Sequence, residues 1–412
     1  MLAQPLRTDL PPEQVVMRLA AYARAHGLAQ PAAVCGEWFG SRAVVAPFLD
    51  VSPRPFPPPV TEVDGEGVGG GWFGFLGYDL ADPSGRHGRL PASAWGWADH
   101  VLRWDSAGNC WFEALDGSRD PELLRSTVER ALAVPVTPRW SASAVRRSSG
   151  HELAVKACVH EIEAGELFQA NVCSRFTGTF RGERAALFAE GVRRLAPRRA
   201  AYVAGDWGAV VSLSPELFLA RRGRRVRSSP IKGTLPRRGP EHEGNDRLLR
   251  RSEKDVAENV MITDLVRNDL GRVCEVGSVV VPELLSVHPA PGVWHLASTV
   301  EGVLAEGVDD AGLLRATFPP GSVTGAPKIR ALDLIAELEP RARGVYTGAA
   351  GIVSPVAGME LNVAIRTFEI AGGVLELGVG GGITADSDGA AEWRECLDKA
   401  APLEHLLATP PR

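Results

Sequence analysis

One lysine of this chain, Lys232, stands in an unusual local setting. It lies in the run 230–234, Pro-Ile-Lys-Gly-Thr, between a rigid proline and a flexible glycine and near the end of a predicted strand. Two helix-like segments elsewhere in the chain each carry a pair of acids three residues apart. An amine combined with two sets of carboxylates indicates an anionic substrate bound through a metal ion, with the amine as nucleophile. Lys232 is therefore the candidate nucleophile.

The first acidic pair is Asp255 and Glu258, and the second is Glu392 and Glu395. Acids at this spacing share one helix face, where their charges repel, and a divalent cation would relieve the repulsion. Oxygen ligands without histidine or thiolate favour Mg²⁺, which takes one or two carboxylates together with waters and substrate oxygens. Taken alone, however, the spacing fits a solvated helix face better, with Glu395 pairing with Lys399 one turn later.

Further polar or glycine-rich segments stand in apolar surroundings. The stretch 321–328, Gly-Ser-Val-Thr-Gly-Ala-Pro-Lys, leads into a predicted helix whose N–H groups could bind a carboxylate or be an ordinary N-cap. The glycines at 380–382 could let backbone N–H groups approach a ligand, or form a plain turn. Arg366, in a strand-like segment, requires a carboxylate partner from the substrate or from the protein. His295 alone fits a hydrogen-bonded core histidine better than a site residue.

Charge and cysteine usage narrow the class of protein. The chain has 45 Lys and Arg against 50 Asp and Glu, a net charge of −5, which disfavours nucleic acid and anionic membranes as partners. Its six cysteines show no C-x-x-C spacing, so a zinc site or a disulfide framework is not expected. The N-terminus lacks the form of a signal peptide, and no apolar run approaches about 18 residues. We expect a cytoplasmic protein that does not cross a membrane.

These candidate residues must be positioned by a large mixed fold. At 412 residues the chain exceeds one ordinary core, and the polar stretch around 138–150 is the candidate boundary between an N-terminal part, 1–149, and a catalytic region, 150–412. Predicted helices and strands do not alternate strictly, which favours an α+β class over a doubly wound sheet. The predicted helices are 151–164, 252–270 (closed by Gly271), 327–338 and one from Ala390, and the predicted strands are 168–180, 209–220, 345–353, 361–370 and 374–379.

Eight stretches of the second part of the chain form an ordered set of motifs. They are 165–171, 214–218, 230–234, 254–259, 264–270, 321–328, 346–348 and 392–399. Through these stretches, from about residue 150 to its end, the chain resembles the chorismate-utilising enzymes, which include the large subunits of anthranilate synthase and aminodeoxychorismate synthase. A Gly-aromatic stretch near 69–80 resembles the N-terminal part of the same family more weakly. The resemblance implies two stacked β-sheets around a central active-site cleft with helices outside, chorismate as substrate and Mg²⁺ as cofactor.

The resemblance also implies a role for individual residues. Glu258 and Glu395 resemble the Mg²⁺ ligands, and Asp255 and Glu392 would hold metal-bound waters, which replaces the solvated-face interpretation. Glu216 resembles the general acid that protonates the departing 4-hydroxyl, a role that requires a carboxyl kept protonated by burial or by nearby negative charge. The residues expected to bind or surround the substrate are Gln169, Gly233, Thr234, His295, Thr324, Tyr346, Arg366, Gly380, Gly382 and Lys399.

Two positions discriminate among reactions within this family. Members that add water carry a lysine base where this chain has Gln169. At the Lys232 position anthranilate synthases typically read Pro-Ile-Ala-Gly-Thr, whereas many aminodeoxychorismate synthases have lysine. The resemblance therefore implies amination of chorismate at ring carbon 4, with attack of Lys232 at carbon 2. The alternative for Lys232 is a loop lysine that only pairs with a substrate carboxylate.

The ammonia source is expected outside this chain, because no cysteine elbow for glutamine hydrolysis is present. We expect a separate glutaminase subunit, and a separate lyase that acts on released 4-amino-4-deoxychorismate. Two alternatives stay open: anthranilate synthase component I, and a non-catalytic subunit that binds chorismate.

Overall fold

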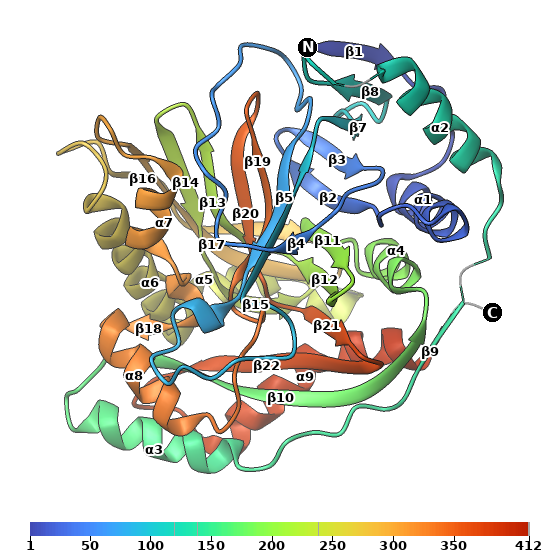
Figure 1. The fold of residues 1–412 in the computed structure, drawn as a ribbon. Helices are drawn as coiled ribbons and strands as arrows, with labels where there is room; N and C mark the ends of the chain where they lie inside the picture. The colour runs from blue at the N-terminus through green and yellow to red at the C-terminus, as the bar shows by residue number, and fades with distance from the viewer. Residues whose placement is uncertain (119, 138, 238, 411–412) are drawn as a thin grey trace.

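Two antiparallel β-sheets, with helices packed on their outer sides, form the frame of the protein (Figure 1). The computed structural model describes residues 1–118, 120–137, 139–237 and 239–410. Within those ranges one sheet has twelve strands and the other ten, and the strands of both sheets pair antiparallel. The predicted α+β class, with two sheets and outer helices, is confirmed.

The first sheet begins with the N-terminal strand, and the strand that carries Gln169 lies next to its other edge. Its order is β1 (Leu2–Pro5), β8 (Cys110–Ala114), β7 (His100–Trp104), β3 (Ser41–Ala46), β2 (Ala32–Trp38), β11 (Arg199–Gly205), β12 (Gly208–Ser214), β21 (Thr367–Ala371), β22 (Val374–Ile383), β10 (Gln169–Gly182) and β18 (Gly325–Ala326), with β9 (Trp140–Ala142) paired to β10.

The second sheet begins with the strand that carries Lys232. Its order is β15 (Ile231–Pro236), β17 (Val293–Val303), β14 (Arg225–Ser229), β13 (Leu217–Arg222), β20 (Gly358–Val363), β19 (Ala349–Ser354), β5 (Gly71–Leu76), β6 (Ser93–Ala98) and β4 (Ser52–Pro53), with β16 (Val280–Ala290) paired to β17.

Helices cover the outer side of each sheet (Figure 1). Those against the first sheet include α4 and α9, and those against the second include α5 and α6. The helices of the described residues are α1 (Pro12–His26), α2 (Pro121–Ala133), α3 (His151–Glu163), α4 (Arg184–Leu195), α5 (Asn245–Arg251), α6 (Glu253–Gly271), α7 (Asp310–Thr317), α8 (Lys328–Leu338) and α9 (Gly389–Ala408), with short 3₁₀ turns η1 (Tyr78–Leu80), η2 (Pro240–His242) and η3 (Gly321–Val323).

The strands are apolar on both faces because the sheets are covered on both sides. Successive side chains of a strand point to opposite faces. In β2, Ala32 and Val34 therefore enter the core between the sheets, whereas Ala33 and Cys35 enter the core beneath the helices. A third core lies under α6 and α7 on the far side of the second sheet.

Two predicted strands are wrong, and both errors have the same cause. The segment predicted as one strand at 209–220 is β12 in the first sheet followed by β13 in the second, with Glu216 between them. The segment predicted at 361–370 is β20 in the second sheet followed by β21 in the first, with Arg366 between them at φ 50°. Continuous apolar composition indicates burial, but it does not reveal that the chain changes sheets.

Smaller differences concern element ends. The predicted strand 345–353 begins only at Ala349, after Thr347 at φ 66°. Helix α6 ends at Gly271, but its capping residue is Arg272 in the right-handed region, so Gly271 does not form the expected left-handed cap.

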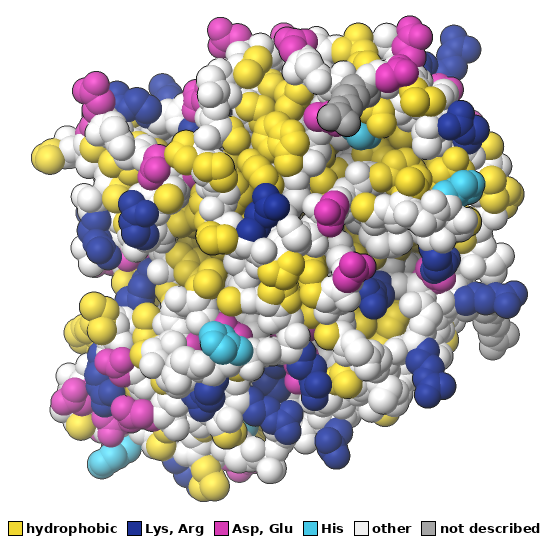
Figure 2. All heavy atoms as spheres, viewed as in Figure 1, with side chains coloured by type: hydrophobic (Ala, Val, Ile, Leu, Met, Phe, Trp, Pro, Cys, Tyr) yellow, Lys and Arg dark blue, Asp and Glu magenta, His cyan; other side chains and the backbone are white. Residues whose placement is uncertain are grey.

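Both sheets contain strands from before and after residue 150, so the division at 149 and 150 stays a prediction. On the face shown in Figure 2, acidic and basic side chains are interspersed, as the nearly balanced composition leads one to expect. No helix of the described residues is long and apolar enough to cross a membrane.

Candidate active site

Glu216 lies where the chain passes from the first sheet to the second. The backbone N–H of Val363, at the end of β20, donates to the Glu216 carbonyl at 3.1 Å. The N–H of Ile231 donates to the Glu216 side-chain Oε1 at 3.4 Å. Since Ile231 opens β15, the carboxyl lies at the base of the strand that carries Lys232.

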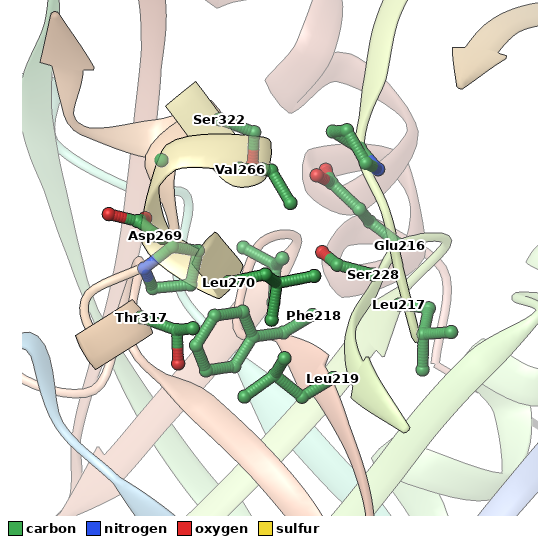
Figure 3. Close-up of a pocket in the computed structure, with 14 residues that line it drawn as sticks. Glu216, Leu217, Phe218, Leu219, Ser228, Val266, Asp269, Leu270, Thr317 and Ser322 are labelled. Atoms are coloured by element: carbon green, nitrogen blue, oxygen red, sulfur yellow. The ribbon is translucent and has the colours of Figure 1, made fainter. Parts of the chain in front are cut away.

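The surroundings of Glu216 suit a proton donor. Glu216 is only 3% exposed, and burial raises the pKa of its carboxyl to about 7. A hydrogen bond from Ser322 and the positive charge of Lys232 act in the opposite direction and lower this pKa. In Figure 3 the carboxyl of Glu216 and the hydroxyl of Ser322 extend toward the same small cavity. A carboxyl with this pKa holds a proton for a substantial fraction of the time near neutral pH, as a general acid requires.

A β-bulge sets the direction of the Lys232 side chain. The pairing of β15 with β17 shifts register between Ile231 and Thr234, and Gly233 has φ 89°, which favours glycine. The Lys232 side chain is 10% exposed, and its Nζ lies 3.6 Å from Glu258 Oε2. The Pro-Ile-Lys-Gly-Thr run is therefore a bulged strand start that turns a buried amine toward a carboxylate.

Gln169 and Gly382 are immediate neighbours of Lys232. A Cβ placed on Gly382 would lie 2.0 Å from Gln169 Nε2 and 3.0 Å from Lys232 Nζ, so a larger residue would displace both. Gln169 is buried, and its Oε1 has no hydrogen-bond partner in the part of the chain that the structure describes. The site therefore contains a free amide oxygen close to the amine.

The two acidic helices start from capped ends and converge on the same place. Ser252 caps α6 by accepting from the N–H of Asp255 at 3.3 Å, and Asp388 caps α9 by accepting from the N–H of Ala391 at 2.9 Å. Lys254 of α6 joins the helices, since its Nζ lies 3.1 Å from Glu392 Oε1 of α9. Sequence spacing predicts each acidic pair but not this meeting of the pairs.

The carboxylates of this cluster differ in electrostatics. Burial raises the pKa of Glu258, although Lys232 and Lys254 oppose the shift. Burial also acts on Glu395, but Lys399 at 2.7 Å, Lys254 and Lys232 outweigh it and leave the pKa of Glu395 below its usual value. Glu395 is therefore ionised at neutral pH.

The cluster fits a hard divalent cation. Glu392 Oε2 is buried and has no hydrogen-bond partner among the described residues, and a Cβ on Gly381 would lie 3.3 Å from it. The same part of the chain shows no preformed group of three or more His, Cys, Asp or Glu donors. This donor set suits an ion such as Mg²⁺ that completes its shell with waters and substrate oxygens.

Arg366 acts electrostatically with Glu216, and His295 pairs with the strand that carries Lys232. The Arg366 guanidinium is partly buried and makes no hydrogen bond or ion pair within the described residues, although burial and the charge of Glu216 both act on its pKa, which is lowered overall. His295 shares a hydrogen bond of 2.9 Å with Thr234 Oγ1 across the β15–β17 pair. Burial and Arg366 lower the pKa of His295 to about 3, so its imidazole is neutral.

A sequence profile described as "chorismate binding enzyme" matches residues 42–405. The chain belongs to the chorismate-binding enzyme family. Aminodeoxychorismate synthase component 1 of Klebsiella aerogenes is 41% identical to it over 356 residues, which cover 82% of this chain and 77% of that protein. Anthranilate synthase component 1 of Streptomyces coelicolor is 38% identical over 367 residues, 80% of this chain and 71% of that protein.

A solved structure of anthranilate synthase component I from Streptococcus pneumoniae TIGR4 matches with a TM-score of 0.74 and 28% identity, over 84% of this chain and 83% of that one. This similarity confirms the anthranilate synthase component I-like fold that the sequence predicted.

The contacts of the remaining predicted residues differ. Asp255 is next to Gly233, whose Cβ would lie 3.0 Å from the Asp255 Cβ, and Lys399 Nζ donates to the Gly380 carbonyl at 3.1 Å. The Thr324 hydroxyl donates to the Pro320 carbonyl at 2.8 Å, and the Tyr346 hydroxyl lies 3.9 Å from Cys173 Sγ. Substrate binding by these residues stays a prediction.

Two functional candidates were not singled out from the sequence. Ser322 lies inside the 321–328 stretch, but nothing in its spacing indicates a hydrogen bond to Glu216. Lys254 follows the N-terminus of α6 by one residue, and its pairing with Glu392 of α9 depends on how the helices pack.

Proposed function

We propose that this protein converts chorismate and ammonia to 4-amino-4-deoxychorismate, with Lys232 as covalent nucleophile. The observation that carries the proposal is the position of Lys232, whose amine lies 3.6 Å from Glu258 and beside Gln169 in a bulge. The similarity to aminodeoxychorismate synthase component 1 of Klebsiella aerogenes supports the same reaction.

In the first step the Lys232 amine forms a bond to ring carbon 2. The ring double bonds shift, the bond between carbon 4 and its oxygen breaks, and the hydroxyl leaves as water with the proton of Glu216. Burial of Glu216 supports this role, because the carboxyl retains a proton near neutral pH. The enzyme then holds the ring through Lys232, and Glu216 is ionised.

In the second step ammonia forms a bond to carbon 4. The double bonds shift back, the bond between carbon 2 and Lys232 breaks, and the amine of Lys232 is restored. The new amino group gives one proton to Glu216, so the acid is ready for another cycle. Two successive displacements leave the amino group para to the ring carboxylate, whereas it is ortho in anthranilate.

Glu258 and Glu395, with Glu392 and Asp255 beside them, would hold Mg²⁺, which supplies positive charge for a carboxylate of the substrate. Arg366 and the backbone at 380–382 are suited to the other anionic groups, because the guanidinium forms no ion pair within the described residues, although the charge of Glu216 acts on it. Neutral His295 can lie against the ring without adding charge.

A second component is part of the proposal. The name "component 1" of the relatives indicates a partner for those proteins. By analogy we expect a separate glutaminase that supplies ammonia to this chain, and a separate lyase that consumes the released product.

The test is a product assay with purified protein, chorismate, Mg²⁺ and ammonium, with a chelator control that removes the metal. We expect 4-amino-4-deoxychorismate, seen as 4-aminobenzoate after addition of a lyase. Fluorescent anthranilate as the main product would instead support the second candidate, anthranilate synthase, which the 38% identity to the Streptomyces coelicolor enzyme favours. Chorismate binding by calorimetry without turnover, even with a glutaminase, would indicate a binding subunit.

A further inference from the structure

A small cavity lies on the side of Glu216 that faces α6 (Figure 3). Its lining is mostly apolar, and few polar side chains reach it. Ser322 is one of them, and in Figure 3 its hydroxyl and the Glu216 carboxyl extend toward the same space, where the hydroxyl acts as a hydrogen-bond donor that lowers the pKa of the carboxyl. In an enclosed apolar environment a single hydroxyl has a large influence on where a carboxyl points, because no solvent competes for the hydrogen bond. The polar residues of the lining are Glu216, Ser228, Asp269, Thr317 and Ser322.

We infer that Ser322 is a positioning residue for the Glu216 carboxyl, and that the ion pair between Asp269 and Lys328 holds Ser322 in place. This inference rests on the proposed function, in which Glu216 gives up a proton and regains it. A serine hydroxyl can donate to an ionised carboxylate and accept from a protonated one. Ser322 can therefore keep the carboxyl in one orientation through both halves of the cycle.

The ion pair is buried and has no role in the proposed chemistry. Lys328 Nζ donates to Asp269 Oδ2 at 2.5 Å, to the Thr317 carbonyl at 2.8 Å and to the Pro319 carbonyl at 3.0 Å. One lysine at the start of α8 thus ties helix α6 to the segment that immediately precedes η3. A buried pair with its remaining protons satisfied fixes geometry even where it adds little stability.

The turn that carries Ser322 is also packed closely on α6. A Cβ on Gly321 would lie 2.8 Å from the Leu265 side chain, so a larger residue would push that side chain away. Ser322 itself is buried at 8% exposure. The close packing of this turn on α6 therefore limits where the Ser322 side chain can move.

Several charged groups act on Glu216 besides Ser322. Lys232 approaches from β15, Arg366 from the crossing between β20 and β21, and Asp269 of α6 lies on the wall of the same cavity. The two cations and the Ser322 hydrogen bond favour the ionised carboxyl, whereas burial opposes it. Removal of the Ser322 hydroxyl should therefore shift Glu216 further toward its protonated form.

The experiment compares Ser322→Ala with Ser322→Thr, which keeps a hydroxyl, and with Ser228→Ala, which removes a hydroxyl from the same cavity. We expect Ser322→Ala to lower kcat about 10-fold and leave KM for chorismate within about 2-fold, since only orientation of the acid is lost. The fall of the Ser322→Ala rate at alkaline pH should begin at a higher pH than in the wild type. Ser322→Thr should regain most of the rate, and Ser228→Ala should resemble the wild type.

A second readout does not depend on turnover. Infrared difference spectra between each protein and its Glu216→Gln partner follow the protonation of Glu216 directly. A higher pKa of Glu216 in Ser322→Ala than in Ser228→Ala supports the inference, even if the wild type makes no 4-amino-4-deoxychorismate and the proposed function fails. Equal titrations in both variants, or an equal loss of rate in Ser228→Ala, overturn it.

Discussion

Lys232 lies between two regions in which the pKa of a buried carboxyl is shifted in opposite directions. On the side of β13 and η3, burial raises the pKa of Glu216 to about 7. On the side of α9, burial also acts on Glu395, but Lys399, Lys254 and Lys232 outweigh it and lower the pKa of that carboxyl. Glu216 thus retains a proton near neutral pH, whereas Glu395 retains its negative charge.

The difference comes from the number of lysines rather than from burial alone. The α6 and α9 cluster has four acids and receives Lys232, Lys254 and Lys399. Glu216 has the Ser322 hydroxyl and one N–H, and the cations Lys232 and Arg366 act on it. Lys232 thus acts both on a carboxyl with a raised pKa and on the acidic cluster of α6 and α9, and each prediction below alters one of these two surroundings.

The largest effect is expected for Lys232→Ala, because the amine between the two regions is lost. We expect kcat to fall at least about 10³-fold, since the proposed route has no other nucleophile. Mass spectrometry of enzyme trapped during turnover should show a covalent adduct that this variant lacks. Lys254→Ala removes a lysine from the same acidic cluster and should keep the adduct. An unchanged rate in Lys232→Ala would remove the nucleophile from the mechanism.

Glu216→Gln tests the proton-retaining side. We expect kcat to fall about 10²-fold, within the usual contribution of a general acid. In the wild type Glu216 is active when it is protonated, so the rate should fall as pH rises through about 7. This fall should be absent in Glu216→Gln. The measurement is kcat/KM between pH 5.5 and 9 for both proteins. A wild-type profile that is flat through pH 7 would contradict the assignment.

The same residue affects stability, with a sign fixed by its pKa. Because folding raises the pKa of Glu216 from 4.5 to about 7, the protonated carboxyl stabilises the fold below pH 4.5, and that contribution is lost as pH rises through 7. The shift corresponds to about 3 kcal/mol. Urea unfolding should therefore show Glu216→Gln gaining stability relative to the wild type at pH 8 compared with pH 5.

How much of this site the sequence could predict depends on where each residue lies. The acids of α6 and α9 follow from helical spacing, and the long helices were placed within a few residues. Their identity as a shared cluster needed the family resemblance, because helix spacing does not say which faces meet.

Glu216 and Arg366 illustrate what sequence patterns miss. Both stand where a single apolar run crosses from one sheet to the other, and the runs were predicted as uninterrupted strands. Long-range backbone contacts fix both crossings: the Val363 N–H donates to the Glu216 carbonyl, and the Leu213 N–H donates to the Arg366 carbonyl. Periodicity reports burial, whereas such crossings depend on pairing with distant strands.

Glu395→Gln and Glu258→Gln test the side that retains negative charge. Each removes one carboxylate of the candidate Mg²⁺ site, so the Mg²⁺ concentration for half-maximal rate should rise about 10- to 100-fold. Mg²⁺-dependent thermal stabilisation, measured without substrate, should weaken in parallel. Glu404→Gln is the control, because Glu404 lies on α9 with Glu395 but pairs with Arg147, outside the acidic cluster. An unchanged Mg²⁺ requirement in both variants would place the ion elsewhere.

The smallest effect is expected for Gly381→Ala, and substitution of the adjacent Gly382 serves as its comparison. Adjacent residues of a strand point to opposite faces. A Cβ on Gly381 would lie 3.3 Å from Glu392 Oε2 and 3.8 Å from Glu395 Oε1, which is tight but possible. We expect a rise of about 2- to 5-fold in the Mg²⁺ requirement, with kcat at saturating Mg²⁺ unchanged, because a methyl group narrows the cluster without removing a ligand.

Gly382→Ala should do the reverse. Its Cβ would meet Gln169 Nε2 at 2.0 Å and Lys232 Nζ at 3.0 Å, so the amine must move. We expect a lower kcat at every Mg²⁺ concentration with little change in the Mg²⁺ requirement itself. Steady-state rates across a Mg²⁺ series separate the two variants. If both substitutions altered the Mg²⁺ requirement equally, the acidic cluster and the Lys232 amine would not act independently. The division of the site into two regions would then be wrong.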